Sequence, residues 1–437
     1  MKVLKFGGTS VGSAQRMRDV AALIAGRGKN IIVLSAMSGT TNSLLEIAAA
    51  TAEGRLDEAA VMVRNLKEKY WKEIDALYDL PGYGNFVKES IGDIFSYLEW
   101  LASERQHPNL EKEIVALGEK LSTTMMHYCM KEMGLKSELM PAYDFIRKNA
   151  DGEPDMDYLR NNIGKFMPED RDLYITQGFI CRDSEGRTDN LERGGSDYTA
   201  SLIGAALKAE EVEIWTDIDG MHNNDPRFVE WTSPVHNLHF EEAAELAYFG
   251  AKILHPTCIL PAKNANVPVR LLNTMDPEAQ GTLIDWNLIE GRIKAVAAKD
   301  GITAIKIKSD RMLLAYGFLK KVFEIFERYK TPIDMITTSE VGVSVTIDND
   351  SHLDEIVAEL DALGNVTVDS DMVIVCVVGD LEWQNRGFEA AALDALKDIP
   401  VRMISYGGSN YNISFLIRRA DKVEALRQLS RHLFNRP

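Results

Sequence analysis

Residues 1–13 read MKVLKFGGTSVGS, and this stretch sets the expected fold of the chain. The apolar run Val3–Phe6 predicts a short strand that ends in the turn Gly7-Gly8-Thr9-Ser10. Helical spacing of apolar residues follows over Ala14–Ala25, and Asn30–Ser35 (NIIVLS) predicts a second strand. Strand, loop, helix and strand in this order form the unit of a parallel sheet, so the sequence predicts an α/β fold.

The composition predicts two or three packed domains, because the chain has 437 residues, of which 45% are hydrophobic. The net charge of -17 argues against a nucleic-acid-binding surface. No apolar run approaches the ~20 residues of a membrane span, and the N-terminus lacks the layout of a signal peptide. Four widely spaced cysteines favour reduced thiols over a zinc site or disulfides: Cys129, Cys181, Cys258 and Cys376. We therefore expect a soluble cytoplasmic protein without nucleic-acid or membrane partners.

The first two-thirds of the chain continue the alternation of strands and helices, with one interruption. Glu46–Trp100 is long, charged and helix-prone, so we interpret it as a helical insertion. The other expected elements are the helices Glu111–Glu132, Tyr198–Ala209 and Phe240–Phe249 and the strands Leu173–Thr176, Val212–Thr216 and Val267–Leu272.

The pattern changes after about residue 290, near the candidate boundary Gly281–Val296. The segments TPIDMITTSEVGVSV, from Thr331, and IPVRMISYGGSNYNISF, from Ile399, both run Pro, Met, Ile, a polar turn and a strand. We interpret them as an internal repeat of a βαββαβ module. The expected strands are Ala304–Lys308, Ile333–Thr338, Val341–Asp348, Met372–Val378, Val401–Ser405 and Asn412–Ile417, and the expected helices are Phe318–Tyr329, Leu353–Leu363, Phe388–Lys397 and Lys422–Leu433.

Two glycine-rich stretches have the pattern of a phosphate site. Lys5 precedes a Gly-Gly pair at the end of the first strand, and residues 193–197 (RGGSD) stand directly before a helix. Glycines let backbone N–H groups approach a phosphate, and basic side chains add positive charge. Facing each other, the stretches would form a cradle for a polyphosphate and an anionic acceptor, with Arg193 on a carboxylate. Two plainer alternatives stay open, an ordinary glycine turn and an Asp197 that only caps its helix.

Polar residues also follow several of the other expected elements. Trp215–Gly220 and Asn224–Arg227 suit a ligand pocket at the carboxyl edge of a parallel sheet, although turn chemistry explains them equally well. Lys252 would meet a phosphate or the C-terminal dipole of its own helix. Ser35–Asn42 would bind a polar substrate or cap the next helix. For Glu119, the default interpretation is a helix-surface glutamate paired with a nearby lysine.

Taken together, these stretches resemble the amino acid kinase family and, within it, the aspartate kinases. The resemblance rests on KFGGTSVGS, LSAMSGTTN, LGEKLS, ITQGFI, ERGGSDYTASL, VEIWTDIDG, NNDPR, FGAKILHP, GFLKKVFEIF and IDMITTSEVGVSV, which follow the family's order. It implies a catalytic α/β domain over residues 1–290, a sandwich around a mainly parallel sheet with a helical insertion at about 46–135. It also implies a regulatory domain over residues 291–437, made of two interleaved α+β ACT modules of βαββαβ order.

The resemblance implies transfer of the γ-phosphoryl group of ATP to the side-chain carboxylate of L-aspartate, with Mg²⁺ bridging the phosphates. Lys5 would stabilise the transferring group, and Asp197 would orient Lys5. The implied phosphate cradle consists of Gly7, Gly8, Thr9, Gly194 and Gly195. The implied aspartate-binding residues are Ser35, Thr41, Glu119, Arg193 and Ser196, and the implied ATP-binding residues are Thr216, Asp217, His222, Asp225, Arg227 and Lys252. No side chain is assigned to a metal.

Two positions depart from the family's pattern. Glu192 stands where a glycine is expected before the second glycine-rich stretch, and its charge would reshape the phosphate loop. His222 lies in a segment where the family favours a tyrosine. Because Lys5 and Asp197 are retained, we still expect catalytic activity.

In the C-terminal part, the resemblance implies an amino-acid effector, lysine or threonine, bound between the ACT modules. Asp334 would bind an ammonium group of the effector, and backbone groups near Gly317 would bind its carboxylate. Edge-to-edge pairing of ACT modules implies a homodimer or a higher assembly. The implied effector-binding residues are Met312, Gly317, Phe318, Leu319, Ile333, Asp334, Thr338, Ser339 and Glu340.

Three other interpretations stay open. The C-terminal part would sense nothing if it served only for dimerisation. The enzyme would be another amino acid kinase if it acted on glutamate, N-acetylglutamate or carbamate. The chain would be a non-catalytic amino-acid sensor if Glu192 disabled the phosphate loop. The GTTN turn, the context of Glu119 and the paired modules favour aspartate, and Lys5 and Asp197 speak against the sensor.

Overall fold

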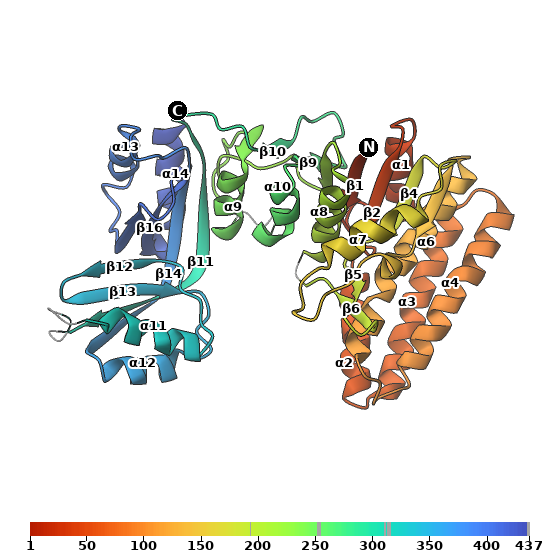
Figure 1. The fold of residues 1–437 in the computed structure, drawn as a ribbon, viewed down its shortest axis with the longest axis horizontal. Coiled ribbons are helices and arrows are strands. Elements are labelled where there is room, and N and C mark those ends of the chain that lie inside the picture. The colour runs from red at the N-terminus through yellow and green to blue at the C-terminus, as the bar shows by residue number, and fades with distance from the viewer. Residues whose placement is uncertain (193, 251–254, 310–311, 313–315, 435–437) are drawn as a thin grey trace. The chain divides into compact units, whose positions relative to one another are not determined.

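The structure is a computed structural model that describes residues 1–437 except 193, 251–254, 310–311, 313–315 and 435–437 (Figure 1). The chain divides into two compact units. The first contains Met1–Gly220 and Leu254–Trp286, and the second contains Met221–Ile253 and Asn287–Pro437. Two predicted site residues, Arg193 and Lys252, lie outside the described residues.

The first unit is built on a mainly parallel sheet in which β1 (Lys2–Phe6) pairs with β2 (Asn30–Leu34) and β7 (Val212–Thr216). β2 is an almost continuous apolar run, and β2 and β7 are buried along nearly their whole length, as expected for strands that are covered on both faces. Because these strands are parallel, their carboxyl ends meet at one edge, where a ligand site is expected. The order is β3–β4–β2–β1–β7–β9–β10, with β3 at Ser137–Met140, β4 at Leu173–Gln177, β9 at Val269–Asn273 and the antiparallel β10 at Thr282–Asp285.

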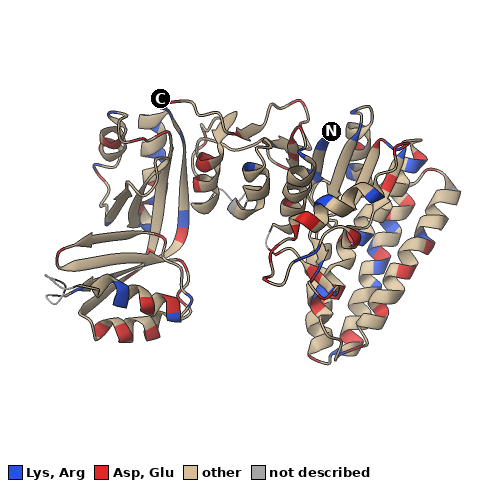
Figure 2. Cartoon of the chain, viewed as in Figure 1, with Lys and Arg blue, Asp and Glu red and all other residues tan. Residues whose placement is uncertain are grey.

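A helical insertion follows β2, as predicted, and its helices α3 and α4 lie side by side (Figure 1). Acidic and basic residues are spread along these two helices (Figure 2). Tyr70 and Phe95 are buried where the two helices face each other. The expected single helix Glu111–Glu132 is divided at Ala116. The insertion comprises α2 (Thr40–Ala52), α3 (Leu56–Leu77), α4 (Pro81–Leu101), α5 (Leu110–Val115) and α6 (Leu117–Glu132).

The remaining elements of the first unit cover the sheet or edge the site. α8 (Gly195–Leu207) packs against β1, and α6 packs against β4. The others are α1 (Ala14–Ile24), α7 (Met156–Asn162), α10 (Leu260–Asn264), the hairpin of β5 (Ile180–Arg182) and β6 (Thr188–Asn190), and the short 3-10 helices Ala142–Asp144, Ile163–Phe166 and Pro256–Ile259.

The second unit is built on one antiparallel sheet in the order β12–β13–β11–β14–β16–β15. The long strands β11 (Ile293–Lys308) and β14 (Asn365–Gly379) pair along their length, with a register shift between Lys299 and Ile302. The other strands of this sheet are β12 (Ile336–Ser339), β13 (Gly342–Ile347), β15 (Met403–Tyr406) and β16 (Asn412–Arg418). The unit also contains the short strand β8 (Asn237–His239), outside this sheet, and the helices α9 (Phe240–Tyr248), α11 (Phe318–Arg328), α12 (Leu353–Asp361), α13 (Phe388–Ala395), α14 (Lys422–Leu433) and the 3-10 helix Arg419–Asp421.

The two long strands run through both βαββαβ modules, and each strand contributes one half to each module. In one module, Ile305 of β11 shares an apolar core with Phe318 of α11. In the other, Val296 of β11 shares a core with Phe388 and Phe415. The sequence predicted only Ala304–Lys308 of β11 and Met372–Val378 of β14, and the predicted start of β12 was three residues early.

Within the described part of the chain, no helix combines the length and the apolarity that a membrane crossing requires.

Candidate active site

The glycine turn after β1 is held against two neighbouring strand ends. The backbone N–H of Gly7 donates to the carbonyl oxygen of Trp215 in β7 at 3.1 Å, and the N–H of Ser38 donates to that of Gly8 at 3.1 Å. A Cβ at Gly8 would stand 2.7 Å from the carbonyl oxygen of Ala36, so only glycine fits where these two loops meet. The loops after β1 and β2 therefore approach each other closely at the carboxyl edge of the sheet.

Lys5 and Asp197 form a nearly buried ion pair at this edge. Lys5 Nζ lies 2.6 Å from Asp197 Oδ1, and the two side chains are 10% and 15% exposed. Asp197 lies in the first turn of α8, whose N-cap is Gly194 at φ 74°, and Gly195 is the first residue of the helix. No side chain that the structure describes caps α8, so Asp197 is not the cap of its helix, and its carboxylate pairs with the Lys5 ammonium group instead. A Cβ at Gly194 would lie 2.5 Å from Cys258 Sγ, so this turn also requires glycine.

Glu119 is a buried carboxyl group with one unused oxygen. The side chain belongs to α6 and is 4% exposed as a residue, so it is not the surface glutamate of the default interpretation. Its Oε1 accepts the backbone N–H of Ala36 at 3.1 Å, and its Oε2 has no hydrogen-bond partner among the described residues. Burial raises the pKa of Glu119 to about 8, although the Ala36 bond and the charge of Lys5 both lower it. Once ionised, a buried carboxyl group with a free oxygen is suited to bind an ammonium group.

The other predicted substrate and cradle residues lie on the same loops and helix ends. The carbonyl oxygen of Ser35, at the end of β2, accepts a hydrogen bond from Ser122 Oγ of α6 at 2.8 Å. Thr41 is in the first turn of α2, Ser196 is in the first turn of α8, and both are partly buried. Thr9 follows the Gly-Gly pair and is also partly buried.

The positions predicted to contact ATP fall in both compact units. In the first, Thr216 ends β7, and its hydroxyl donates to the carboxylate of Asp217 at 3.2 Å. In the second, Arg227 Nη2 binds Asp225 Oδ2 at 2.6 Å, and the imidazole of His222 is hydrogen-bonded to a threonine hydroxyl. Burial alone would raise the pKa of Asp225, but the bonds from Arg227 lower it. That these residues line one nucleotide site stays a prediction.

The predicted effector-binding residues lie in the second unit. Gly317 is the N-cap of α11 at φ 80°, a backbone conformation that favours glycine. Met312, Phe318, Leu319 and Ile333 all pack on one apolar cluster, the core of the first βαββαβ module. Thr338 and Ser339 end β12, Glu340 lies in the turn that follows, and all three are exposed.

Asp334 already has a cation of the protein beside it. Lys299 Nζ lies 2.7 Å from Asp334 Oδ1 and 2.8 Å from Asp348 Oδ2, and the Tyr248 hydroxyl donates to Asp334 Oδ1 at 2.7 Å. Sequence reasoning missed Lys299, Tyr248 and Asp348. No sequence motif indicates this cluster. Tyr248 lies in α9, Lys299 lies in β11 and Asp348 directly follows β13, so the three residues meet only in the folded unit.

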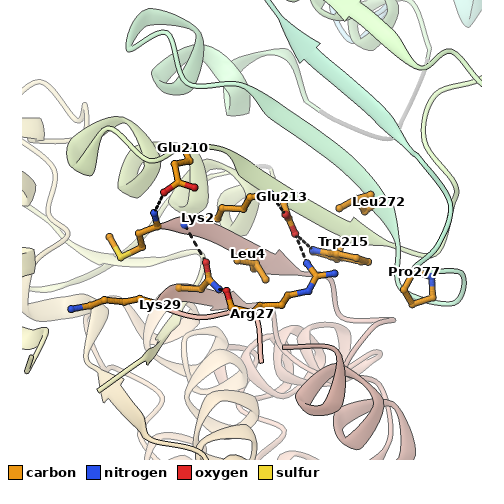
Figure 3. A pocket seen from close by; sticks show the side chains of 11 residues that line it. Lys2, Leu4, Arg27, Lys29, Glu210, Glu213, Trp215, Leu272 and Pro277 are labelled. Atoms are coloured by element: carbon orange, nitrogen blue, oxygen red, sulfur yellow. Dashed lines mark hydrogen bonds and ion pairs between the residues drawn. The ribbon is translucent and has the colours of Figure 1, made fainter. Parts of the chain in front are cut away.

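A pocket of about 620 Å³ opens beside the first residues of β1 and β2 (Figure 3). Its charged groups are used within the protein, since Glu213 accepts bonds from Lys2 at 2.8 Å, Arg27 at 3.0 Å and Trp215 Nε1 at 2.9 Å. None of the predicted site residues that the structure describes lines it. The lining residues are Met1, Lys2, Leu4, Arg27, Lys29, Asn30, Glu210, Glu213, Trp215, Leu272 and Pro277.

A lysine–aspartate pair at the carboxyl edge of a parallel sheet, in one chain with paired βαββαβ modules, points to a regulated phosphotransferase. The model of the amino acid kinase family matches residues 1–273, and an ACT domain model matches residues 375–433. The chain belongs to the amino acid kinase family and, within that family, to the aspartokinases.

The relatives support this placement over the whole chain. Lysine-sensitive aspartokinase 3 of Escherichia coli (strain K12) is 34% identical over 99% of this chain and 99% of its own. Crystal structures of E. coli aspartokinase III, one with aspartate and ADP (R-state) and one with lysine and aspartate (T-state), each match with a TM-score of 0.81. They are 33% and 34% identical and cover 100% of both chains. These findings confirm the resemblance that the sequence motifs predicted.

Proposed function

We propose that this chain transfers the γ-phosphoryl group of ATP to the side-chain carboxylate of L-aspartate and releases ADP and 4-phospho-L-aspartate. This product is the first intermediate on the way to lysine and threonine. The observation that carries the proposal is the unused Oε2 of Glu119, an oxygen of a buried carboxyl group within the electrostatic influence of the Lys5 ammonium group. One group would bind the ammonium of the amino-acid substrate, and the other would meet the phosphates.

The reaction needs little proton transfer, because the acceptor carboxylate is already ionised near neutral pH. A bond forms between a carboxylate oxygen of aspartate and the γ-phosphorus, while the bond from that phosphorus to the β–γ bridging oxygen breaks and its electron pair leaves with ADP. The protein must align two anions and neutralise the charge that gathers between them. Lys5, fixed by Asp197 at 2.6 Å, would supply that positive charge.

The remaining roles follow the positions of the predicted residues. Gly7, Gly8, Gly194 and Gly195 would present backbone N–H groups to the phosphates, and Thr9 would line the same turn. Arg193 would bind the α-carboxylate of aspartate, and Ser35, Thr41 and Ser196 would complete its pocket. Thr216, Asp217, His222, Asp225, Arg227 and Lys252 would contact the nucleotide.

Mg²⁺ would enter with ATP. The described residues contain no group of three or more His, Cys, Asp or Glu side chains that could hold a metal ion. That arrangement fits Mg²⁺, which keeps several water ligands and binds mainly to the phosphates of its nucleotide. When bound, the ion would neutralise phosphate charge alongside Lys5.

The C-terminal modules would provide feedback control, with lysine as the effector. The support comes from the full-length relative named lysine-sensitive and from the related structure with lysine bound. Asp334 would bind an effector ammonium group, and the backbone near Gly317 would bind its carboxylate. We also expect a homodimer through the ACT modules and a cytoplasmic location, with which the free, buried cysteines agree.

The test is ATP- and Mg²⁺-dependent formation of an acyl phosphate from L-aspartate, trapped with hydroxylamine, with and without L-lysine. Lys5→Met should lower kcat by a factor of about 100 or more, since it removes preorganised charge at the transferring group. Lys2→Met is the matched control at the other end of the same strand, where Lys2 pairs with Glu211 and Glu213. A wild-type protein that binds lysine but gives no acyl phosphate would support the sensor interpretation instead.

A further inference from the structure

Three residues of α3, in the helical insertion, bind the two loops of the candidate active site. Lys69 Nζ donates to the carbonyl oxygen of Ser38 at 2.9 Å. The Tyr70 hydroxyl lies 3.0 Å from Thr40 Oγ1, and both residues are 0% exposed. Both contacts fall on the loop after β2, the loop that also supplies the Ala36 N–H for Glu119.

Glu73, one turn further along α3, contacts the other loop. Its Oε2 accepts the backbone N–H of Ala14 at 2.7 Å, and Ala14 is the first residue of α1, at the end of the loop that follows β1. The two loops are joined to each other by the bond from Ser38 N–H to the Gly8 carbonyl oxygen at 3.1 Å. One face of α3 thus reaches both the loop expected to bind aspartate and the loop expected to bind phosphate.

We propose that Tyr70 and Glu73 are positioning residues for the two substrates of the reaction, Tyr70 for aspartate and Glu73 for ATP. The assignment rests on the proposed function of the two loops. Tyr70 is a stable anchor, because its ring packs edge-on against Phe95 of α4 with the centroids 5.7 Å apart. A hydroxyl fixed in this way sets the start of α2, and with it Thr41 and the backbone around Ala36.

The test compares three variants in the full-length enzyme, after wild-type turnover has established the proposed function. Tyr70→Phe should raise the KM for aspartate about three- to tenfold, the usual effect of one lost hydrogen bond, with the KM for ATP unchanged. Glu73→Ala should raise the KM for ATP by a similar factor, with the KM for aspartate unchanged. Tyr78→Phe is the control, since its buried hydroxyl on the same insertion donates to Met125 O at 2.6 Å, far along the chain from either loop.

Loss of stability alone would affect the Tyr70 and Tyr78 variants alike and would not separate the two substrates. The proposal is overturned if each of the two variants, Tyr70→Phe and Glu73→Ala, changes the KM for aspartate and the KM for ATP alike. It is also overturned if neither variant changes either KM value. A wild-type enzyme without turnover would instead refute the proposed function.

An independent observation concerns the carboxylate of Asp334. Its side chain is 1% exposed, and Lys299, 16% exposed, lies against Oδ1 at 2.7 Å. Oδ2 is buried and has no hydrogen-bond partner within the described parts of the chain. Lys299 also binds Asp348 at 2.8 Å, so its ammonium would keep one carboxylate if it left Asp334. An effector ammonium would therefore meet a site that is already neutralised.

The second module has an equivalent ion pair with the charges exchanged. Ile302 of β11 pairs with Met372 of β14. Lys299 lies three positions before Ile302, and Asp369 lies three positions before Met372, so these two residues occupy equivalent positions on the two strands. Asp369 binds Arg402 at 2.9 Å. Arg402 directly precedes Met403 in the second repeat, as Asp334 directly precedes Met335 in the first. This second pair is more exposed, at 32% and 45%, and provides a matched control.

We infer that Lys299 is an internal counter-ion that the effector displaces from Asp334, and that Asp348 holds Lys299 after the exchange. This inference rests on the proposed effector role of Asp334. Effector binding is then an exchange of one ammonium group for another, and its affinity is set by how firmly the protein's own lysine is held.

Calorimetric titration of the full-length protein with L-lysine tests this exchange. Lys299→Met should bind lysine about tenfold more tightly than wild type, because a charge-assisted competitor is gone. Asp348→Asn should bind it more weakly, because Lys299 loses its second partner. Asp369→Asn, in the second module, should leave the affinity unchanged.

Lysine binding by Lys299→Met with the same or lower affinity than wild type would overturn the inference. Binding by this variant but not by wild type would support it in its strongest form. If neither binds lysine while aspartate-dependent turnover persists, the effector site and this inference fail together, and the proposed catalytic function stands.

Discussion

Replacing Glu119 by glutamine separates the charge of this residue from its shape. The amide oxygen would still accept the Ala36 N–H, which now binds Oε1 at 3.1 Å. The amide nitrogen would take the place of Oε2, which has no hydrogen-bond partner among the residues described. The variant would therefore keep the loop in place and lose only the acceptor proposed for the substrate ammonium.

The expected loss of binding follows from the burial of the site. A hydrogen bond to a charged group contributes about 1.5–3 kcal/mol, and removal of one partner of a buried ion pair costs about 3–5 kcal/mol. Because Glu119 is only 4% exposed, the range for buried pairs applies, and we use its lower end, a loss of about 3 kcal/mol of binding free energy for aspartate. Each 1.4 kcal/mol is a factor of ten, so the KM for L-aspartate should rise about 100-fold. The KM for ATP should stay within about threefold.

The pH dependence gives a second measure of the same charge. Because the pKa of Glu119 is raised to about 8, the carboxyl group of the free enzyme is protonated at neutral pH and cannot pair with an ammonium. Wild-type kcat/KM for aspartate should therefore rise between pH 6 and pH 8, by up to about tenfold per pH unit. The Glu119→Gln variant should show a flatter profile over this range.

Stability should change in the opposite direction. Between the ordinary glutamate pKa of 4.5 and the folded value of about 8, the native protein holds a proton that the unfolded chain has released. The free energy of unfolding should therefore fall as pH rises through this window, by about 1.4 kcal/mol per unit at most. Glu119→Gln removes this loss, so at pH 9 the variant should unfold at a higher temperature than wild type.

The control is Glu242→Gln in the second unit. Glu242 is also fully buried, with Oε2 accepting the His239 N–H at 2.8 Å and Oε1 lacking a partner within the described chain. Burial also raises its pKa. This variant should leave the KM for aspartate unchanged. An aspartate KM for Glu119→Gln within threefold of wild type, with the pH profile intact, would refute the assignment of Glu119.

Three further perturbations test the geometry. Gly8→Ala should lower kcat at least tenfold and reduce the thermal stability, since overpacking against the Ala36 carbonyl oxygen 2.7 Å away costs about 1–3 kcal/mol; steady-state kinetics and melting curves check this. Asp197→Asn should lower kcat about 100-fold with an unchanged circular dichroism spectrum, because a misplaced Lys5 loses its alignment. Burial lowers the pKa of His127 to about 4. The free energy of unfolding of wild type should therefore fall from pH 6.5 to pH 4, by up to about 1.4 kcal/mol per pH unit, and that of His127→Gln should fall less; urea unfolding at each pH checks this.

The first strands could be predicted from the sequence because their local pattern and their burial agree. β1 and β2 are short apolar runs between turn residues, and both are buried in the sheet. β14 was predicted only from Met372 onward, because its first half, NVTVDSD, is polar and mostly exposed. That half is a strand because it pairs with residues of β11 that are 57 to 65 positions away along the chain. Pairing over such a distance leaves no local signal.

The site could be predicted only in part, for a related reason. Motifs named Lys5, Asp197 and Glu119, and the structure shows that the first two are paired and that the third is buried beside a strand end. No motif indicated that Glu119 has an unused oxygen, because this depends on which groups of other elements come near it. Lys299 was missed because it lies in the first half of β11, which the sequence did not predict as a strand.

Glu119 and Asp334 show how a buried carboxylate can be prepared for an ammonium group in two different ways. Each has one oxygen that is hydrogen-bonded and one that lacks a partner in the described structure. Glu119 has no ion-pair partner among the described residues, and burial raises its pKa, so a free enzyme at neutral pH stores a proton that aspartate must release. Asp334 has Lys299 at 2.7 Å, so an effector must release a lysine instead. Substrate affinity should therefore depend on pH through Glu119, whereas effector affinity should depend on the charge at position 299, and the two dependences can be measured separately in one protein.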